Sequence, residues 1–116
     1  MSRTNTARTI LILGLSFVFL YFGIDKFANA LLWIGWIPTW MDGFLGFSSS
    51  AWLSVIGSIE IVLGLALLTP VKMLRQTASI LMALHLIGIL TQVGWNDVGA
   101  RDIGLLFMSI SVWFLL

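Results

Sequence analysis

The sequence contains no cysteine, a single histidine and only two prolines among its 116 residues. Without cysteine, the chain can form no disulfide, no thiolate metal site and no dithiol redox centre. The lone histidine, His85, excludes a haem held by two histidines of this chain and any metal site built from several histidines. Redox chemistry would therefore need a bound molecule or a partner subunit.

Charge is also scarce. Charged residues make up 9% of the chain, whereas soluble domains usually carry roughly a quarter. Apolar residues make up 59%, and the mean hydropathy is +1.06. A soluble domain of this size leaves much of its surface in water and could not hide so much apolar area. The composition predicts one integral membrane domain, and the net charge of +1 gives no reason to expect nucleic-acid binding.

Four apolar runs are present, and a helix needs about 20 apolar residues to cross the hydrocarbon core of a membrane. Charged or polar breaks separate the runs near residues 25–26, 70–72 and 96–102. We therefore predict an all-α fold, a four-transmembrane-helix antiparallel bundle with an interfacial or re-entrant segment between its first two helices. The expected spans are residues 8–27, 50–69, 73–95 and 98–116, with the interfacial segment at 28–48.

The basic residues indicate the orientation of these spans. Four cations without an acidic neighbour fall on one side of a four-span topology: Arg3, Arg8, Lys72 and Arg75. The other side holds Lys26 and Arg101, each next to an aspartate. Because cytoplasmic loops carry an excess of Lys and Arg, we expect both termini on the cytoplasmic side of the inner membrane.

A cleaved secretory signal is an alternative reading of the first run. Arg8, an apolar stretch and Ala28-Asn29-Ala30 resemble such a signal with an A-x-A cleavage site. The run is slightly long for a signal, and Asp25-Lys26 lies between it and the cleavage site. These features favour a retained first span.

The segment after the first span is rich in tryptophan. Trp33, Trp36 and Trp40 follow spacings of three and four, so they would share one face of a helix that Pro38 would kink or end. Tryptophan favours the membrane interface, where its ring is in an apolar setting and its N–H is hydrated. The three rings are either an anchoring belt or the wall of a ligand site.

Two titratable residues lie inside the apolar runs. Charged groups are costly at mid-membrane and need a reason to be there. Glu60 follows Ala51 by nine residues and His85 precedes Trp95 by ten, so at 1.5 Å per residue both lie about 14–15 Å below the same interface. A direct hydrogen bond or ion pair between them is therefore geometrically open. It would serve either as a structural brace or as a protonatable site that transfers protons or hydrogen-bonds a quinone carbonyl.

Helical spacing predicts which residues face the bundle interior, because small and polar residues favour helix contacts in membranes. The predicted inward stripes are Gly14, Val18, Tyr21 and Asp25 in the first span, Gly57, Glu60 and Gly64 in the second, Ala78, Leu81, His85, Gly88 and Gln92 in the third, and Arg101, Gly104, Met108 and Ser111 in the fourth.

Five ionisable residues gather at the outer ends of the first and fourth spans. They are Asp25, Lys26, Asp97, Arg101 and Asp102. We expect Asp25 to pair with Arg101, and Lys26 to pair with Asp97 or Asp102. The cluster is either a structural clasp or a site for a headgroup or ligand.

The sequence resembles the DoxX family of small four-helix membrane proteins. The matching pieces are Phe22-Gly23-Ile24-Asp25-Lys26-Phe27, Glu60-Ile61-Val62-Leu63-Gly64, the basic turn from Lys72 to Arg75, and Arg101-Asp102-Ile103-Gly104-Leu105-Leu106. The resemblance implies a four-helix bundle in the cytoplasmic membrane and associations with quinone-linked sulfur oxidation and oxidative-stress complexes. The positions that carry over are Lys26, Glu60, Arg101 and Asp102.

Three functions fit these observations. The first is a quinone- or lipid-associated accessory subunit of a membrane redox or stress-response system. The second is a scaffold or assembly partner for a redox or envelope protein, since no nucleophile-plus-base arrangement is present; self-association is also expected of such a small bundle. The third is a proton-coupled transporter like the small multidrug resistance proteins, although their membrane glutamate lies in the first span. The candidate ligand- or proton-binding residues are Glu60, His85, Lys26, Arg101, Asp102, Asp25, Tyr21, Gln92 and Trp36; no metal ligand is predicted.

Overall fold

The computed structural model describes residues 2–116 and is helical throughout its regular structure. Its long helices are α1 (Arg3–Ala28), α3 (Ser49–Leu68), α4 (Lys72–Val93) and α5 (Asp97–Leu115), and a short α2 (Ala30–Trp33) follows α1. Each long helix is long and apolar enough to cross a membrane. The predicted all-helical class with four such helices is therefore confirmed.

Local signals in the sequence explain where the helices begin and end. The side chains of Ser2, Ser48 and Asn96 cap α1, α3 and α5 by accepting a hydrogen bond from a backbone N–H in the first turn. The Ser2 cap explains why α1 starts at Arg3 rather than near residue 8. Pro70 follows the end of α3, and Gly94 ends α4 with a φ of 77° that favours glycine.

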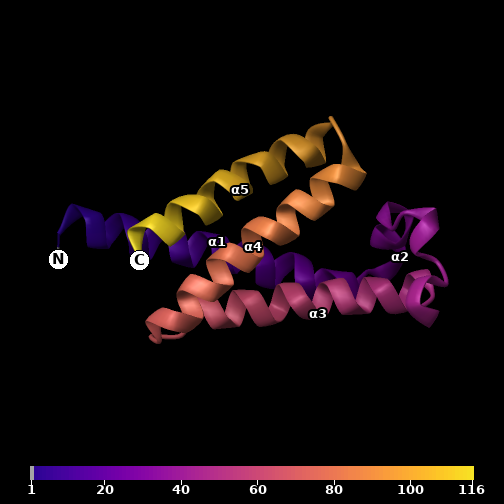
Figure 1. The fold of residues 1–116 in the computed structure, drawn as a ribbon, viewed down its shortest axis with the longest axis horizontal. Helices are drawn as coiled ribbons and strands as arrows, with labels where there is room; N and C mark the ends of the chain where they lie inside the picture. Colours follow the sequence, from indigo (N-terminus) through magenta and orange to yellow (C-terminus); the bar gives the residue numbers. More distant parts are fainter. Residues whose placement is uncertain (1) are drawn as a thin grey trace.

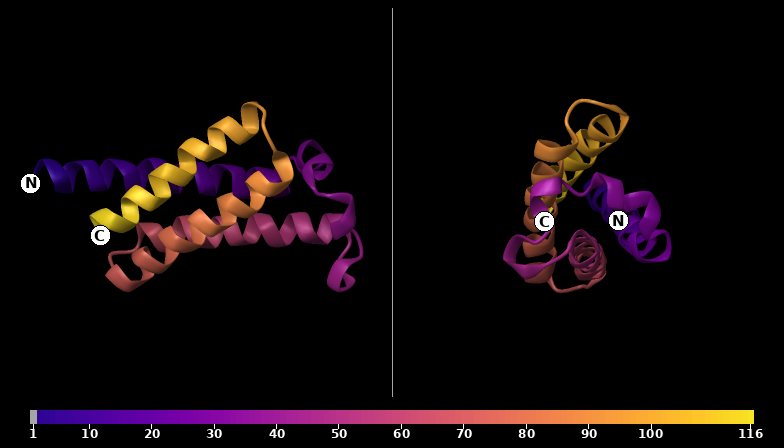
Figure 2. Two further views of the ribbon diagram at one scale, coloured as in Figure 1. Left: turned by 45° about the horizontal axis from the view of Figure 1, so that its top comes forward. Right: turned by 90° about the vertical axis from the view of Figure 1, so that its right-hand side faces the viewer.

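The four long helices form two pairs. α1 packs along α3, and α4 packs along α5. The chain reverses direction between successive long helices, so both termini lie at the same end of the molecule (Figure 1). The α4–α5 pair diverges from the α1–α3 pair toward the opposite end, where α2 lies (Figures 1 and 2).

Glycines bring α1 and α3 into close contact. A Cβ atom added to Gly23 would lie 2.9 Å from the carbonyl oxygen of Gly57, and one added to Gly57 would lie 3.0 Å from the carbonyl oxygen of Gly23. A Cβ on Gly64 would lie 2.8 Å from Leu20 Cγ. Small residues allow such backbone approach between membrane helices. The predicted stripe of Gly57, Glu60 and Gly64 is buried, as expected.

The predicted inward stripes of α1 and α5 are largely wrong, because Gly14, Tyr21, Gly104 and Ser111 are exposed. The predicted stripe of α4 is largely right: Ala78 is buried, and His85, Gly88 and Gln92 line the cavity between the helix pairs that is described below, whereas Leu81 is exposed. The buried residues are Ile12, Leu15, Ser16, Phe19, Gly23 and Lys26 in α1, Ala78, Ser79, Met82 and Leu86 in α4, and Gly99, Asp102, Leu105, Ser109 and Val112 in α5. Apolar residues surround each helix on all sides, so hydrophobicity alone does not indicate which side packs inward.

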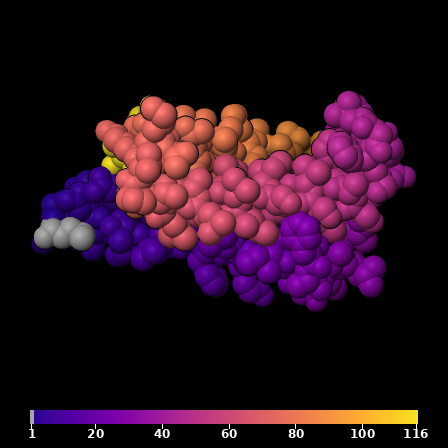
Figure 3. Space-filling view, turned by 90° about the horizontal axis from the view of Figure 1, so that it is seen from below, coloured from indigo at the N-terminus to yellow at the C-terminus, as the bar shows by residue number. Residues whose placement is uncertain are grey.

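The segment between α1 and α3 is compact but irregular. After α2 it forms three 3₁₀ turns, η1 (Ile34–Trp36), η2 (Thr39–Met41) and η3 (Phe44–Gly46). Pro38 separates η1 from η2, so the tryptophans do not lie on one continuous helix. This segment forms the bulky end of the molecule opposite the N-terminus (Figure 3).

Candidate functional site

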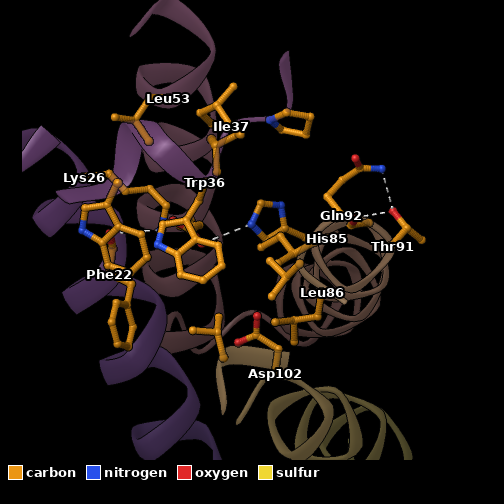
Figure 4. A pocket seen from close by; sticks show the side chains of 18 of the residues that line it. Phe22, Lys26, Trp36, Ile37, Leu53, His85, Leu86, Thr91, Gln92 and Asp102 are labelled. Atoms are coloured by element: carbon orange, nitrogen blue, oxygen red, sulfur yellow. Dashed lines mark hydrogen bonds and ion pairs between the residues drawn. The ribbon is translucent and has the colours of Figure 1, made fainter. Parts of the chain in front are cut away.

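A cavity of about 450 Å³ lies between the two helix pairs. All four long helices contribute to its walls, and the segment after α1 contributes Trp33, Trp36 and Trp40. Polar side chains reach it from α1, α3, α4 and α5. Figure 4 shows three of them, Lys26, His85 and Asp102. Its size and its mixture of aromatic walls with a few polar groups are typical of small-molecule sites.

Three titratable side chains from three helices meet at the cavity. Lys26 Nζ lies 2.7 Å from Glu60 Oε1, and His85 Nε2 lies 3.2 Å from Glu60 Oε2. The contact with Lys26 is an ion pair without the alignment of a hydrogen bond. Lys26 and Glu60 are buried, with side chains 9% and 8% exposed. The contact between Glu60 and His85 that their common depth allows is present in the structure.

The pairing of Lys26 with Glu60 corrects the prediction that Lys26 pairs with Asp97 or Asp102. A Cβ on Gly57 would lie 3.3 Å from Lys26 Cβ, so the close approach of the two helices puts the base of the lysine beside Gly57. Glu60 lies about one turn further along α3, within reach of the long lysine side chain. Packing between α1 and α3 thus provides a nearer partner for the lysine than the carboxylates of α5.

Trp33 packs against Lys26 and is itself held by Asp25. Lys26 Nζ lies 4.1 Å from the centre of the Trp33 ring, a cation–π contact. Trp33 Nε1 donates a hydrogen bond of 2.8 Å to Asp25 Oδ2, and Asn29 donates to the other carboxylate oxygen. Asp25 does not line the cavity. The predicted pair of Asp25 with Arg101 is wrong, because nearby donors on its own side of the molecule occupy both carboxylate oxygens.

Arg101 and Asp102 form the polar wall on α5. Arg101 Nε and Nη2 donate hydrogen bonds of 3.1 and 3.0 Å to Asp102 Oδ1. The guanidinium also lies 4.5 Å from the centre of the Phe22 ring on α1. Asp102 is only 2% exposed, and its Oδ2 is buried without a hydrogen-bond partner among residues 2–116.

One hydrogen bond connects the irregular segment to α4 at the end of the molecule where the two helix pairs diverge. Trp40 Nε1 donates to Gln92 Oε1 at 3.2 Å. Trp40 and Gln92 both line the cavity. Trp33 and Trp36 also line the cavity. The three tryptophans therefore lie where they would if they formed the wall of a ligand site, one of the two roles predicted for them.

Seven of the nine predicted candidates therefore line one cavity: Glu60, His85, Lys26, Arg101, Asp102, Gln92 and Trp36. Asp25 touches it only through Trp33. Tyr21 is 54% exposed and does not line the cavity, because α1 turns a different face inward. Phe22 was missed, although it precedes Lys26 by four residues and so shares its helix face.

The polar side chains of this site form hydrogen bonds and ion pairs. Among residues 2–116, no three His, Cys, Asp or Glu side chains are grouped so that they could hold a metal ion. The cavity offers carboxylates, an imidazole and two cations beside aromatic rings. Such a set can bind the polar ring of an amphipathic molecule.

No protein-family model matches this sequence, and no curated protein or solved structure is significantly similar to it.

Proposed function

We propose that this chain is a multi-pass protein of the cytoplasmic membrane that binds a quinone in the cavity and acts as an accessory subunit of a membrane redox or stress-response system. In this proposal the four long helices form an antiparallel bundle across the bilayer. Both termini face the cytoplasm, where Arg3, Arg8, Lys72 and Arg75 gather, in keeping with the positive-inside rule. The irregular segment lies at the outer interface.

The observation that carries this proposal is the combination of groups at the cavity. A quinone has a flat polar ring and an apolar tail. The rings of Phe22, Trp33 and Trp36 can pack on such a head. The Lys26–Glu60–His85 cluster and the Arg101 guanidinium supply polar contacts for ring oxygens, and apolar helix surfaces beside the opening suit the tail.

The resemblance to the DoxX family agrees with this site. The four positions that the resemblance transfers are Lys26, Glu60, Arg101 and Asp102, and all four line the cavity. They come from three different helices and are separated by up to 76 positions in the sequence (102 − 26). Their convergence on one cavity supports treating the matching motifs as parts of a single site.

A redox role requires a partner. The chain has no cysteine and only one histidine, so it offers neither thiols nor two histidine ligands for a haem. Electrons would pass between the bound quinone and another membrane or envelope protein. Lipid and further copies of the chain are the other expected neighbours.

The test is quinone binding by the purified chain in lipid nanodiscs. A short-chain benzoquinone should quench tryptophan fluorescence saturably, because Trp33, Trp36 and Trp40 line the cavity. Glu60→Gln should weaken this binding about tenfold, since the carboxylate holds Lys26 and His85 in place through charged contacts.

Tyr21→Phe is the matched control, because this aromatic residue lies outside the cavity, and it should bind quinone like the unaltered chain. Quenching that never saturates, as expected for mere partition into lipid, would contradict the proposal. Full binding by Glu60→Gln would also contradict it.

A further inference from the structure

The two cations at the cavity differ in how many of their donors are used within the protein. Lys26 Nζ is directed at Glu60, at the Phe22 carbonyl oxygen 3.4 Å away and at the Trp33 ring. Arg101 uses Nε and Nη2 on Asp102. The lysine donors are thus engaged inside the protein, whereas only two of the five N–H groups of the arginine donate to Asp102.

Asp102, in contrast, has a buried acceptor atom without a donor. Its Oδ1 is paired with Arg101, but its buried Oδ2 accepts no hydrogen bond from residues 2–116. The carboxylate points from α5 toward the part of the cavity lined by Trp36 and His85 (Figure 4). A buried acceptor without a donor costs about 1–3 kcal/mol, and more when it is charged. A ligand donor at this position would remove that cost.

His85 adds a second acceptor. A carboxylate without a proton can only accept, so the contact with Glu60 makes Nε2 the donating nitrogen of the imidazole. In the neutral ring, Nδ1 is then an acceptor. His85 lines the same cavity as Asp102.

We infer that the cavity selects a ring that carries hydroxyl groups, so that it holds the reduced hydroquinone in preference to the quinone, with one hydroxyl donating to Asp102 Oδ2. This inference rests on the function proposed above and specifies the form of the ligand. A quinone carbonyl brings a lone pair toward the Asp102 carboxylate and is repelled. A hydroxyl donates to the carboxylate and can still accept from the Arg101 guanidinium.

The test compares three forms of one ring in nanodiscs under anaerobic conditions: the short-chain hydroquinone, its quinone and its dimethyl ether, which keeps both oxygens but has no donor. Equilibrium dialysis with the unaltered chain should show the hydroquinone binding about tenfold more tightly than the other two, since a hydrogen bond to a charged group contributes at least that factor. This comparison needs no variant, so it does not depend on whether a variant folds.

Asp102→Asn should then remove or invert the preference, because its amide can place an N–H where the carboxylate had an acceptor. Asp97→Asn is the matched control: Asp97 lies exposed on the same helix and outside the cavity, and its variant should keep the preference.

The results of these binding measurements separate a failure of the inference from a failure of the proposed function. Equal binding of hydroquinone and dimethyl ether, or an unchanged preference in Asp102→Asn, would overturn the inference while leaving quinone binding intact. Displacement of hydroquinone by phosphatidylglycerol at equal concentration would overturn it in favour of a hydroxylated lipid headgroup. Saturable binding of none of the three rings would instead refute the proposed function.

Discussion

At the scale of single residues, the decisive feature is the ion pair between Lys26 and Glu60. Either charge alone would be costly within a membrane span. Together they are neutral, and at 2.7 Å they are close enough to compensate much of the loss of hydration. His85 and the Trp33 ring complete the surroundings of the pair. The ion pair therefore allows the two charged side chains to remain buried among apolar helices.

Replacing one member of this ion pair should lower the free energy of unfolding more than replacing both. We expect Lys26→Met to lower the free energy of unfolding by about 3 kcal/mol, because it leaves the Glu60 carboxylate buried without its cation. The double variant Lys26→Met/Glu60→Leu should recover most of that loss. Unfolding by a denaturing detergent, followed by circular dichroism, measures both.

Lys72→Met is the control for this prediction, since Lys72 is exposed at the start of α4 and the change should stay within about 0.5 kcal/mol. Additive effects of the two single substitutions in the double variant would mean that Lys26 and Glu60 are not energetically coupled.

At the scale of helices, the contact between α1 and α3 determines the site. Gly23 and Gly57 let the two backbones touch, and the same contact places Lys26 beside Glu60. The α4–α5 pair packs against this first pair and brings His85, Arg101 and Asp102 to the other side of the cavity. The spacing between the two pairs thus determines the width of the cavity.

A methyl group at this contact should disturb it. Gly23→Ala places a Cβ 2.9 Å from the Gly57 carbonyl oxygen and 2.8 Å from Ile61 Cγ1, so α1 and α3 must move apart. Overpacking of this kind costs about 1–3 kcal/mol. We expect that loss of stability in detergent unfolding, together with weaker quinone binding as the cavity changes shape.

Gly14→Ala provides the comparison within the same helix. Its added Cβ would have no atom within 4 Å, so stability should be unchanged or slightly raised. Equal losses of stability in Gly14→Ala and Gly23→Ala would show that helix propensity, and not the close contact between α1 and α3, determines the change in stability.

At the scale of the whole molecule, the proposed topology can be tested directly because the chain contains no cysteine. A single introduced thiol then reports on one position. We expect Thr39→Cys, in the exposed turn η2, to react with a membrane-impermeant maleimide in intact spheroplasts. Ser2→Cys and Val71→Cys, at the other end of the molecule, should react only after lysis.

Labelling of all three thiols in lysed membranes confirms that each is accessible to the reagent. Reaction of Ser2→Cys or Val71→Cys before lysis would place that end outside and contradict the proposed orientation. Because these positions are outside the cavity, the result is independent of ligand binding.

The sequence by itself determined the properties that depend on one stretch of chain. Four apolar runs predict four long helices, because the apolarity of about 20 consecutive residues is a local property. The depth of Glu60 and His85 also followed from the sequence, since a helix rises by a constant 1.5 Å per residue. That common depth made their contact in the structure possible.

Only the tertiary structure decided which face of each helix packs inward and which charges pair. The predicted stripes of α1 and α5 were largely wrong, because helices that are apolar on every side lack the polar face that would indicate their rotation. The partner of Lys26 is likewise determined by two glycines on separate helices, whose contact no local pattern specifies. The cavity arises from the divergence of two helix pairs, and that divergence depends on how the side chains of all four helices pack together.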